Sequence, residues 1–436
     1  MVSQDLQGES FMRRRVVVTG MGVIAPNGHG LDSFGKALRE GRSGICYIPK
    51  TAELNFGCQV AGIPEGFEKI REDYFDQEEL LSLNDNVGFA SVAAIDAWRD
   101  GGFRVPAVGD DDVDWDTGVI AGSGIGGMET IAETLVPVVN QGKCRRLGSR
   151  VVEQVMNSAT SARIAGLLAL GNQVTSNSSA CSTGNEAIIE GVRRIRNGLA
   201  TRMLAGGSEG ASPYIWAGFD AMRVLSRKFN DRPLEASRPM SASAAGFVPG
   251  AGGAFLLLEE LESALARGAR IYAEVLGGMI NCGGQRTGGT MTAPNPEGVI
   301  RCVRGAIADA EIPAEQIDLI NGHLTATTAD PGEVKNWSVA LGRGPENFPW
   351  INSTKSMIGH CLGAAGAIEC VAVVLQLKDG FIHPSINCED VHPEIAPYEG
   401  SIPHAEVEFP DLKIAVKAGF GFGDVNSCLV FKKWGK

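Results

Sequence analysis

An internal repeat constrains the fold of this chain more than any other feature. The run Ala187-Ile-Ile-Glu190 resembles Gly366-Ala-Ile-Glu369, at an offset of 179 residues. Each run continues as a helical pattern that ends at an Asn-Gly or Asp-Gly pair. The same offset pairs Cys181 with His360 in the loops before the two helices. The repeat predicts two similar halves whose matching loops carry a thiol and an imidazole. Chance similarity between two helices rich in Ala, Gly and Ile is the alternative.

Cys181 stands among small residues directly before a helical pattern, in the segment Ser179-Ala-Cys181-Ser-Thr-Gly184. Behind it, Ile188, Val192 and Ile195 follow the i, i+4, i+7 spacing of one helix face. A thiol at the N-terminus of a helix feels the positive end of the helix dipole, which lowers its pKa and favours the reactive thiolate. The pattern indicates a nucleophile, and an inert core cysteine is the alternative.

Two of the six histidines lie in contexts that suit them to act with Cys181. His323 follows the apolar run 317–320, which indicates a buried strand, and His360 precedes a helix of small residues. Taken alone, each histidine fits a structural role better than a catalytic one. A cysteine together with separate histidines is nevertheless a nucleophile pattern of intracellular enzymes. The other four stand among Gly, Pro, Asn or acidic residues, which predicts surface loops for His29, His383, His392 and His404.

Short apolar runs alternate with helical patterns along the chain, which predicts an α/β fold. A first set of elements ends near residues 267–270, and a second set starts at Ile271. The stretch 210–249 has weak periodicity and is predicted to form a cap with loops. The first set comprises strands at 16–18, 118–121, 202–205 and 254–258 and helices at 89–98, 161–169 and 186–196, and the second set comprises the runs 271–276, 300–306, 317–320, 369–377, 414–416 and 428–431.

The segment Gly122-Ser-Gly124-Ile-Gly126-Gly127 has the G-x-G-x-x-G spacing of a dinucleotide site and precedes a plausible helix at 128–135. Two observations argue against that function. The motif is not in the first strand–helix–strand unit, and no apolar strand ending in Asp or Glu follows about 20 residues later to hold a ribose. We therefore predict that these glycines bind no dinucleotide.

Composition excludes several classes of protein. A formal net charge of −12, without a basic stripe interleaved with aromatic residues, argues against nucleic-acid binding. No apolar run reaches the length of a membrane span, and the first eleven residues lack a signal-peptide core. The ten cysteines show no paired C-x-x-C spacing, and no cluster of ligand residues has zinc spacing. These features predict a cytoplasmic protein without a catalytic metal.

Further motifs follow one another in a fixed order. Residues 16–26 read Val-Val-Val-Thr-Gly-Met-Gly-Val-Ile-Ala-Pro, and Ala205-Gly-Gly-Ser-Glu209 follows the cysteine helix. Lys355-Ser-Met-Ile-Gly-His360 and Phe420-Gly-Phe422-Gly-Asp-Val-Asn426 come later. Together with the Cys181 segment, these motifs resemble the β-ketoacyl-acyl-carrier-protein synthases of the elongating type, within the thiolase-like superfamily. The resemblance extends from residue 15 to residue 433.

The resemblance implies a five-layer αβαβα fold built from two related halves. The halves would comprise residues 13–265 and 266–436, with residues 1–12 as a flexible N-terminal arm. The implied reaction is a decarboxylative Claisen condensation, in which an acyl group on Cys181 joins malonyl-acyl carrier protein to give β-ketoacyl-acyl carrier protein. The resemblance implies no cofactor, an acyl carrier protein as partner, and a homodimer, with a heterodimer as the alternative.

The motif positions also imply roles for single residues. Cys181 would carry the acyl group, and the backbone N–H groups of Cys181 and Phe422 would form the oxyanion hole. His323 and His360 would stabilise the enolate as neutral N–H donors. Lys355 would have an electrostatic and positional role, orienting His323 and nearby acidic groups.

Other positions match supporting and substrate-binding residues. Asp330 and Glu333 resemble acids that hold this lysine. The substrate path would be lined by Ile125 in the acyl pocket, by Thr325 and Thr327 along the pantetheine arm, and by Phe420 beside the Phe422 gate. The basic segment of Lys143, Arg145 and Arg146 would contact the carrier protein, and a solvated charged face is the alternative there.

Two stretches depart from the family pattern. Residues 241–245, Ser-Ala-Ser-Ala-Ala, stand where charged residues are usual, and Asp424-Val425 replaces a usual Gly-Thr. A loop without charged anchors is expected to be more mobile or to be held by other contacts. The departures indicate a specialised polyketide or secondary-lipid enzyme. The alternatives are housekeeping fatty-acid elongation, a condensation–cyclisation enzyme and a non-catalytic partner subunit of a ketosynthase heterodimer.

Overall fold

The computed structural model describes residues 13–107 and 109–435. The predicted N-terminal arm, 1–12, lies outside this range. One half of the central β-structure contains β1 (Val16–Ala25), β8 (Gly252–Glu260), β7 (Arg202–Glu209), β5 (Thr117–Gly122) and β6 (Val174–Thr175), in that order across the sheet. The other half contains β9 (Ala273–Cys282), β15 (Val425–Lys433), β14 (Ile414–Gly421), β10 (Leu319–Asn321) and β11 (Trp350–Asn352).

The two halves of the sheet share one pairing pattern. In the first, β1, β8 and β7 pair antiparallel, and β7, β5 and β6 pair parallel. In the second, β9, β15 and β14 pair antiparallel, and β14, β10 and β11 pair parallel. Residues Val16–Val18 of β1 also pair with β9, so that hydrogen bonds join the two halves. This repeated order agrees with the duplication that the sequence indicates.

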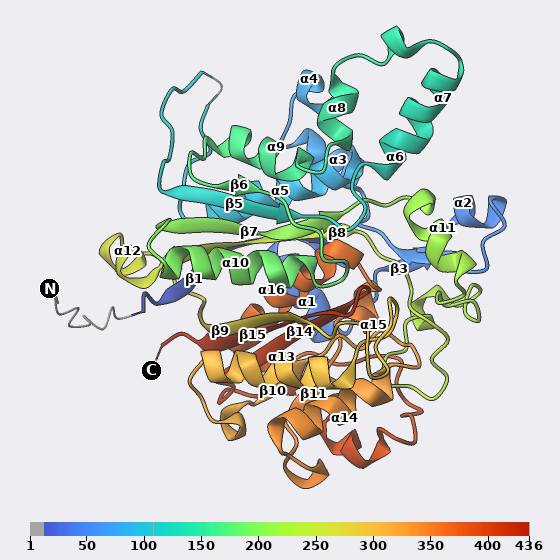
Figure 1. Cartoon of the computed structure of the whole chain (residues 1–436), viewed down its shortest axis with the longest axis vertical. Helices are drawn as coiled ribbons and strands as arrows, with labels where there is room; N and C mark the ends of the chain where they lie inside the picture. Colours follow the sequence, from blue (N-terminus) through green and yellow to red (C-terminus); the bar gives the residue numbers. More distant parts are fainter. Residues whose placement is uncertain (1–12, 108, 436) are drawn as a thin grey trace, which may run out of the picture.

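Helices complete five layers. Figure 1 shows α10 (Thr183–Arg196) and α16 (Ala365–Asp379) between the two halves of the sheet, which form separate layers. One outer layer contains α5 (Asp85–Asp100) and α9 (Ala159–Leu168), and the other contains α13 (Pro296–Asp309) and α14 (Asp330–Leu341). The fold is therefore the predicted α/β, thiolase-like αβαβα arrangement.

The two central helices are those of the sequence repeat, and they meet at their N-terminal ends. A Cβ on Gly184 would lie 2.5 Å from the backbone nitrogen of Ala367, and one on Gly366 would lie 2.7 Å from that of Asn185. Only glycine permits so close an approach of two backbones. The loops that precede α10 and α16, which carry Cys181 and His360, are thus brought together.

The remaining elements form caps and connections. The predicted cap at 210–249 contains one α-helix, α11 (Pro213–Ala221), and the boundary predicted at 265/266 lies at the end of α12 (Leu261–Ala266), between β8 and β9. None of the helices within 13–107 and 109–435 is long and apolar enough to cross a membrane. Smaller elements are β2 (Gly28–His29), α1 (Leu31–Glu40), β3 (Ile45–Tyr47), α2 (Pro49–Glu53), β4 (Val60–Gly62), α3 (Phe67–Glu72), α4 (Gln77–Leu80), α6 (Met128–Thr130), α7 (Val136–Asn140), α8 (Arg150–Val155), α15 (Lys355–Ile358), β12 (Phe381–Ile382) and β13 (Val407–Glu408).

The prediction of a surface loop is wrong for His383. Its side chain is fully buried behind β12, and its Nε2 lies 3.0 Å from the hydroxyl of Thr354. Burial lowers the pKa of His383 to about 4.

Candidate active site

Cys181 lies in a strained turn between β6 and α10. The residue before it, Ala180, has a φ of 48°, in the left-handed region that alanine rarely adopts. The Thr183 hydroxyl accepts a hydrogen bond from the Ser179 N–H and donates one to the Ala180 carbonyl, both at 2.7 Å. The hydroxyl of Ser182 contacts the carbonyl of Gly419 at 3.0 Å. These bonds fix the turn and attach it to β14.

Cys181, His323 and His360 come together, as the sequence predicts. The Nε2 atom of His360 lies 3.0 Å from the Cys181 sulfur. The ring of His323 is 5.3 Å from that of His360, centroid to centroid, and nearly perpendicular to it. One ligand-type atom of each residue lies within 4.8 Å of the other two. Loops from both halves of the molecule therefore build a single site.

The tautomer of His360 follows from its other ring nitrogen. The backbone N–H of Leu362 donates to Nδ1 at 3.2 Å, so Nδ1 accepts and Nε2 carries the proton. His360 therefore directs an N–H donor at the Cys181 sulfur. A metal ion would need a free electron pair on Nε2. The ring proton would then have to move to Nδ1, where it would face the N–H of Leu362.

The charge states at the site are set mainly by burial. Burial raises the pKa of Cys181 to about 11, although the positive charge of Lys355 and the backbone N–H of Phe422 act in the lowering direction. The predicted net lowering of this pKa is therefore wrong, because desolvation outweighs the lowering effect of the backbone N–H groups. Burial, followed by the Lys355 charge, lowers the pKa of His323 and His360 well below its ordinary value, so both are neutral N–H donors.

The thiol pKa predicts the pH dependence of alkylation at Cys181. Because the raised pKa keeps the sulfur protonated near neutrality, the alkylation rate with iodoacetamide should increase about tenfold per pH unit between about pH 6 and pH 9. Mass spectrometry of the peptide that contains Cys181 measures this rate. A plateau already reached near pH 7 would contradict the predicted protonation state.

Lys355 pairs with a residue that sequence reasoning missed. Its ammonium lies 2.5 Å from Oε1 of Glu369, and both side chains are buried. Asp330 and Glu333, predicted to hold this lysine, act instead on the main chain of the His323 loop. Glu333 accepts the N–H groups of His323 and of the next residue, at 2.6 and 2.8 Å. These acids therefore support the site by accepting backbone N–H groups and not by pairing with Lys355.

Asp330 accepts three backbone N–H groups: those of Met240 and Thr325 at 2.9 Å and that of Ala326 at 3.1 Å. Burial raises the pKa of Asp330, and it raises that of Glu333 to about 7. Because Met240 belongs to the cap segment, the same carboxylate joins that segment to the loop of His323. Asp330 thereby sets the backbone position of both.

The predicted substrate-path residues surround the same site. The Thr325 and Thr327 hydroxyls lie 3.1 Å apart, just after His323. The ring of Phe420 is 6.1 Å from that of His323, and Phe422 lies 5.9 Å from Phe219, a residue of α11. Ile125 packs against an apolar cluster that includes Phe247, Val248 and Leu362. Thr325 and Thr327 therefore lie in the His323 loop, Phe420 and Phe422 lie on either side of the last residue of β14, and Ile125 shares an apolar cluster with Leu362.

The glycine-rich segment is occupied by a buried carboxylate. Glu209 accepts the backbone N–H groups of Gly124, Ile125 and Gly363, each at 2.9 Å, and contacts the Ser123 hydroxyl at 3.1 Å. A bound phosphate would need these N–H donors, and the Glu209 carboxylate already accepts their hydrogen bonds. This contact supports the prediction that the segment binds no dinucleotide. Glu209 also links this segment to the loop after His360.

Asp424 connects the gate segment to a neighbouring loop. It is fully buried, has a φ of 62°, and its carboxylate accepts the N–H groups of Gln285 and Asn295, both at 2.8 Å. The Gly423 N–H donates to the carbonyl of Met291 at 2.8 Å. The loop 283–295 is therefore fastened directly behind Phe422.

We expect Asp424→Gly to release this loop. The change removes both carboxylate bonds while tolerating the positive φ, so amide protection over 284–295 should fall about tenfold. Asp424→Asn is the matched control, because its single oxygen keeps one of the two bonds. Hydrogen exchange read by mass spectrometry measures both variants. Unchanged protection in Asp424→Gly would show that the loop is held by other contacts.

The uncharged segment 241–245 is held by other contacts, one of the two outcomes expected for it. Asp390 accepts hydrogen bonds from the Ser241 hydroxyl and from the Ser243 N–H, the latter at 2.9 Å. Arg238 donates to Asp390 at 3.1 Å and to Glu389 at 2.8 Å. Hydrogen bonds from both serines and from Arg238 lower the pKa of Asp390 to about 2. Asp390 and Glu389, in the other half of the chain, thus provide the charged anchors that segment 241–245 itself lacks.

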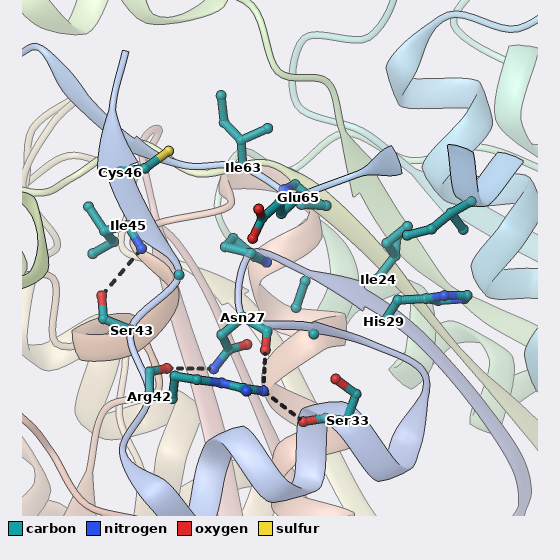
Figure 2. A pocket seen from close by; sticks show the side chains of 16 residues that line it. Ile24, Asn27, His29, Ser33, Arg42, Ser43, Ile45, Cys46, Ile63 and Glu65 are labelled. Carbon is teal, nitrogen blue, oxygen red and sulfur yellow. Dashed lines mark hydrogen bonds between the residues drawn. The ribbon is translucent and has the colours of Figure 1, made fainter. Parts of the chain in front are cut away.

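Two further surface features lie away from the site. Lys143, Arg145 and Arg146 are exposed on the connection between α7 and α8, where they form no ion pair with described residues, whereas Arg150 pairs with Glu78 at 3.2 Å. A separate cavity of about 710 Å³ lies beside β1 and β3. Figure 2 shows its Arg42 donating to the main-chain carbonyls of Asn27 and Ser33. No predicted site residue lines the described part of this cavity.

The fold and the site together define a thiolase-like acyltransferase. Residues 13–264 match the family model described as "Beta-ketoacyl synthase, N-terminal domain", and residues 272–389 match the corresponding C-terminal domain. The chain belongs to the β-ketoacyl synthase family, and it is a ketosynthase.

Relatives and solved structures agree with this assignment. The chain is 36% identical over 425 residues to 3-oxoacyl-[acyl-carrier-protein] synthase 2 of Vibrio cholerae, covering 97% of this chain and 99% of the relative. It is 36% identical over 422 residues to 3-oxoacyl-[acyl-carrier-protein] synthase 1 of Haemophilus influenzae, with 97% and 99% covered.

Among solved structures, the ishigamide ketosynthase/chain length factor superposes with a TM-score of 0.86 at 31% identity, covering 97% of this chain and 100% of that one. A type II PKS ketosynthase bound to a hexaketide, in complex with its acyl-carrier protein, gives a TM-score of 0.85 at 28% identity, with the same coverage. The whole described fold, and not one half of it, is therefore shared.

Proposed function

We propose that the protein joins an acyl group held on Cys181 to malonyl-acyl carrier protein by decarboxylative Claisen condensation. The observation that carries the proposal is the oriented N–H of His360, whose Nε2 lies 3.0 Å from the sulfur while Nδ1 accepts the Leu362 N–H. His323 supplies a second neutral imidazole beside the first. Two neutral donors, of which His360 has a fixed direction, suit the oxygen of an enolate, where negative charge develops during the reaction.

The first half-reaction is acyl transfer. The Cys181 sulfur attacks the thioester carbon of the acyl carrier, a new carbon–sulfur bond forms, and the pantetheine thiol leaves with the proton. The N–H groups of Cys181 and Phe422 both act to lower the pKa of the thiol, which supports their proposed role as donors to the oxyanion.

The second half-reaction forms the carbon–carbon bond. Malonyl thioester loses CO2, and its bonding electrons form an enolate whose oxygen accepts the N–H groups of His323 and His360. The enolate carbon attacks the Cys181 thioester, the sulfur leaves as a thiolate, and a proton taken up from solvent restores the thiol of the free enzyme. Lys355, held by Glu369, provides positive charge close to both imidazoles.

The remaining residues have positions that suit substrate binding. Ile125 would border the acyl chain, Thr325 and Thr327 would bind the pantetheine arm, and Phe420 and Phe422 would separate the two substrates. Lys143, Arg145 and Arg146 would contact the acidic acyl carrier protein. The related structure that was solved with its acyl-carrier protein supports a partner of this kind.

We further propose a specialised polyketide or secondary-lipid role. Support comes from the serine and alanine segment 241–245, whose anchor Asp390 lies in the other half, and from Asp424 behind the gate. The likeness to the ishigamide ketosynthase/chain length factor points in the same direction. Routine elongation is the second candidate, because the V. cholerae and H. influenzae relatives are 3-oxoacyl-acyl-carrier-protein synthases. A condensation–cyclisation enzyme and a non-catalytic partner subunit are the remaining alternatives.

A panel of acyl-acyl-carrier substrates tests these roles. We expect unsaturated, branched or aryl acyl groups to condense faster than saturated straight chains of equal length. Saturated primers used fastest would return the protein to routine elongation. A cyclised product from the purified protein would establish the condensation–cyclisation alternative, and failure of Cys181 to become acylated would establish the non-catalytic one.

A homodimer is proposed from the sheet edge. The outer side of β6 pairs with no strand in the described range, and an unpaired edge is a ready surface for a second copy. Val174 on this edge is exposed, as are Val152 and Met156 in the α8 region. Light scattering during size-exclusion chromatography should give twice the monomer mass. A monomer that dimerises only when a second ketosynthase-like chain is added would establish the heterodimer.

A further inference from the structure

A second buried lysine shares the carboxylate that holds Lys355. The Nζ atom of Lys417, in β14, lies 2.8 Å from Oε2 of Glu369, whose Oε1 holds Lys355 at 2.5 Å. All three side chains are 1% exposed or less. Removing an ammonium from water costs several kcal/mol, and one carboxylate can neutralise only one of two. Stability alone therefore does not explain the second lysine.

The contacts of Lys417 reach three segments around the site. Its ammonium donates to the carbonyl of Gly322 at 3.4 Å, immediately before His323, and to the carbonyl of Ala418, two residues before Phe420. Through Glu369 it also contacts α16, the helix that follows His360. One side chain thus connects the backbone before His323, the strand of the gate and the helix behind His360.

The second ammonium also changes the field at the imidazoles. Burial, Lys355 and Lys417 all act to keep His323 and His360 neutral. The other charged groups near them are Glu369 on α16, Glu333 and Asp330 on α14, and Glu209 at the end of β7. Because Glu333 and Asp330 accept backbone N–H groups around His323, and Glu209 accepts those around Gly363, these acids are screened by bonds of their own.

We propose that Lys417 is a positioning residue for the condensation reaction: its ammonium fixes Glu369 and the backbone before His323, and it supplies a second buried positive charge opposite the developing enolate. This inference rests on the proposed condensation. Lys417 touches neither substrate nor the reacting atoms and acts through the residues that do. Its charge should favour the step that creates negative charge, the decarboxylation of malonyl thioester, more than the transfer of an acyl group to Cys181.

Three variants of the full-length protein separate charge from packing. Lys417→Met keeps the volume and removes the charge, Lys417→Arg keeps the charge, and Lys417→Ala leaves space that methylammonium can enter. Lys378→Met, on the exposed end of α16, is the matched control. Each variant is assayed for acylation of Cys181 and for malonyl-acyl carrier protein decarboxylation as a function of pH.

We expect Lys417→Met to acylate Cys181 at close to the normal rate, while decarboxylation falls at least about tenfold. The acidic limb of its pH profile should move to higher pH, because removing a cation raises the imidazole pKa values. Methylammonium should restore decarboxylation in Lys417→Ala. Normal decarboxylation and an unchanged profile in folded Lys417→Met would overturn the proposal.

If Lys417→Met folds poorly, the methylammonium rescue of Lys417→Ala still tests the proposal. If methylammonium restores the melting temperature of Lys417→Ala but not its decarboxylation, Lys417 is only structural and the proposal fails. The proposed function itself fails differently, since the unmodified protein would then neither acylate Cys181 nor decarboxylate malonyl-acyl carrier protein.

Discussion

Replacing Cys181 by alanine is expected to abolish the acyl-enzyme and to lower condensation on the order of 10⁴-fold or more. The change removes the sulfur to which His360 directs its N–H, which is the atom proposed to form the thioester. Intact-protein mass spectrometry after incubation with an acyl-acyl carrier protein measures the adduct directly. The matched control is Cys46→Ala, which removes an exposed thiol in β3 and should leave the adduct unchanged.

The same variant separates the two half-reactions. Decarboxylation of malonyl thioester needs an enolate stabilised by the two imidazoles, and neither is altered in Cys181→Ala. Release of CO2 should therefore continue without any condensed product. An acyl adduct found on another residue of this variant would show that the nucleophile has been assigned wrongly.

Removing the His360 imidazole is expected to have the second largest effect. In His360→Ala, decarboxylation should fall about 10²- to 10³-fold, the loss that follows when one preorganised donor to an oxyanion is removed. Acyl transfer to Cys181 should fall much less, because the backbone N–H groups of Cys181 and Phe422 remain. Single-turnover assays of each half-reaction measure the difference.

A glutamine at position 360 provides the control for geometry. Its side-chain amide can place an N–H near the position of Nε2, so His360→Gln should retain more decarboxylation than His360→Ala. The corresponding variants of His323 should show the same order. Equal losses in both half-reactions, with unchanged circular dichroism and melting temperature, would contradict this division of roles.

The cluster of Cys181 and His360 could be predicted because the signals for these residues are local and repeated. The offset that links Cys181 to His360 is visible in the sequence, and in the structure both residues precede matching helices of matching sheets. The alternation of apolar runs likewise predicts the strands and helices around them. Roles for these residues came from the family resemblance, since no spacing in one sequence brings His323 to the other two.

Charge pairing could not be predicted in the same way. Glu369 occupies an otherwise apolar stretch of α16, which is itself a signal, because a lone acid in a buried helix must find a partner. The partners, Lys355 and Lys417, lie on other elements, and only the tertiary structure brings them within reach. The pKa of Cys181 could not be predicted for a related reason: the helix start is a local feature, whereas desolvation depends on every layer around the thiol.

The double pairing of Val16–Val18 bears on how the molecule unfolds. These residues hydrogen-bond to β8 on one side and to β9 on the other, so the chain's first strand belongs to both sheets. Separating the halves would expose two unpaired strand edges in the middle of the protein, and such edges promote aggregation. Loss of this short seam should therefore disturb both sheets together, and denaturation should proceed as one cooperative transition rather than one half at a time.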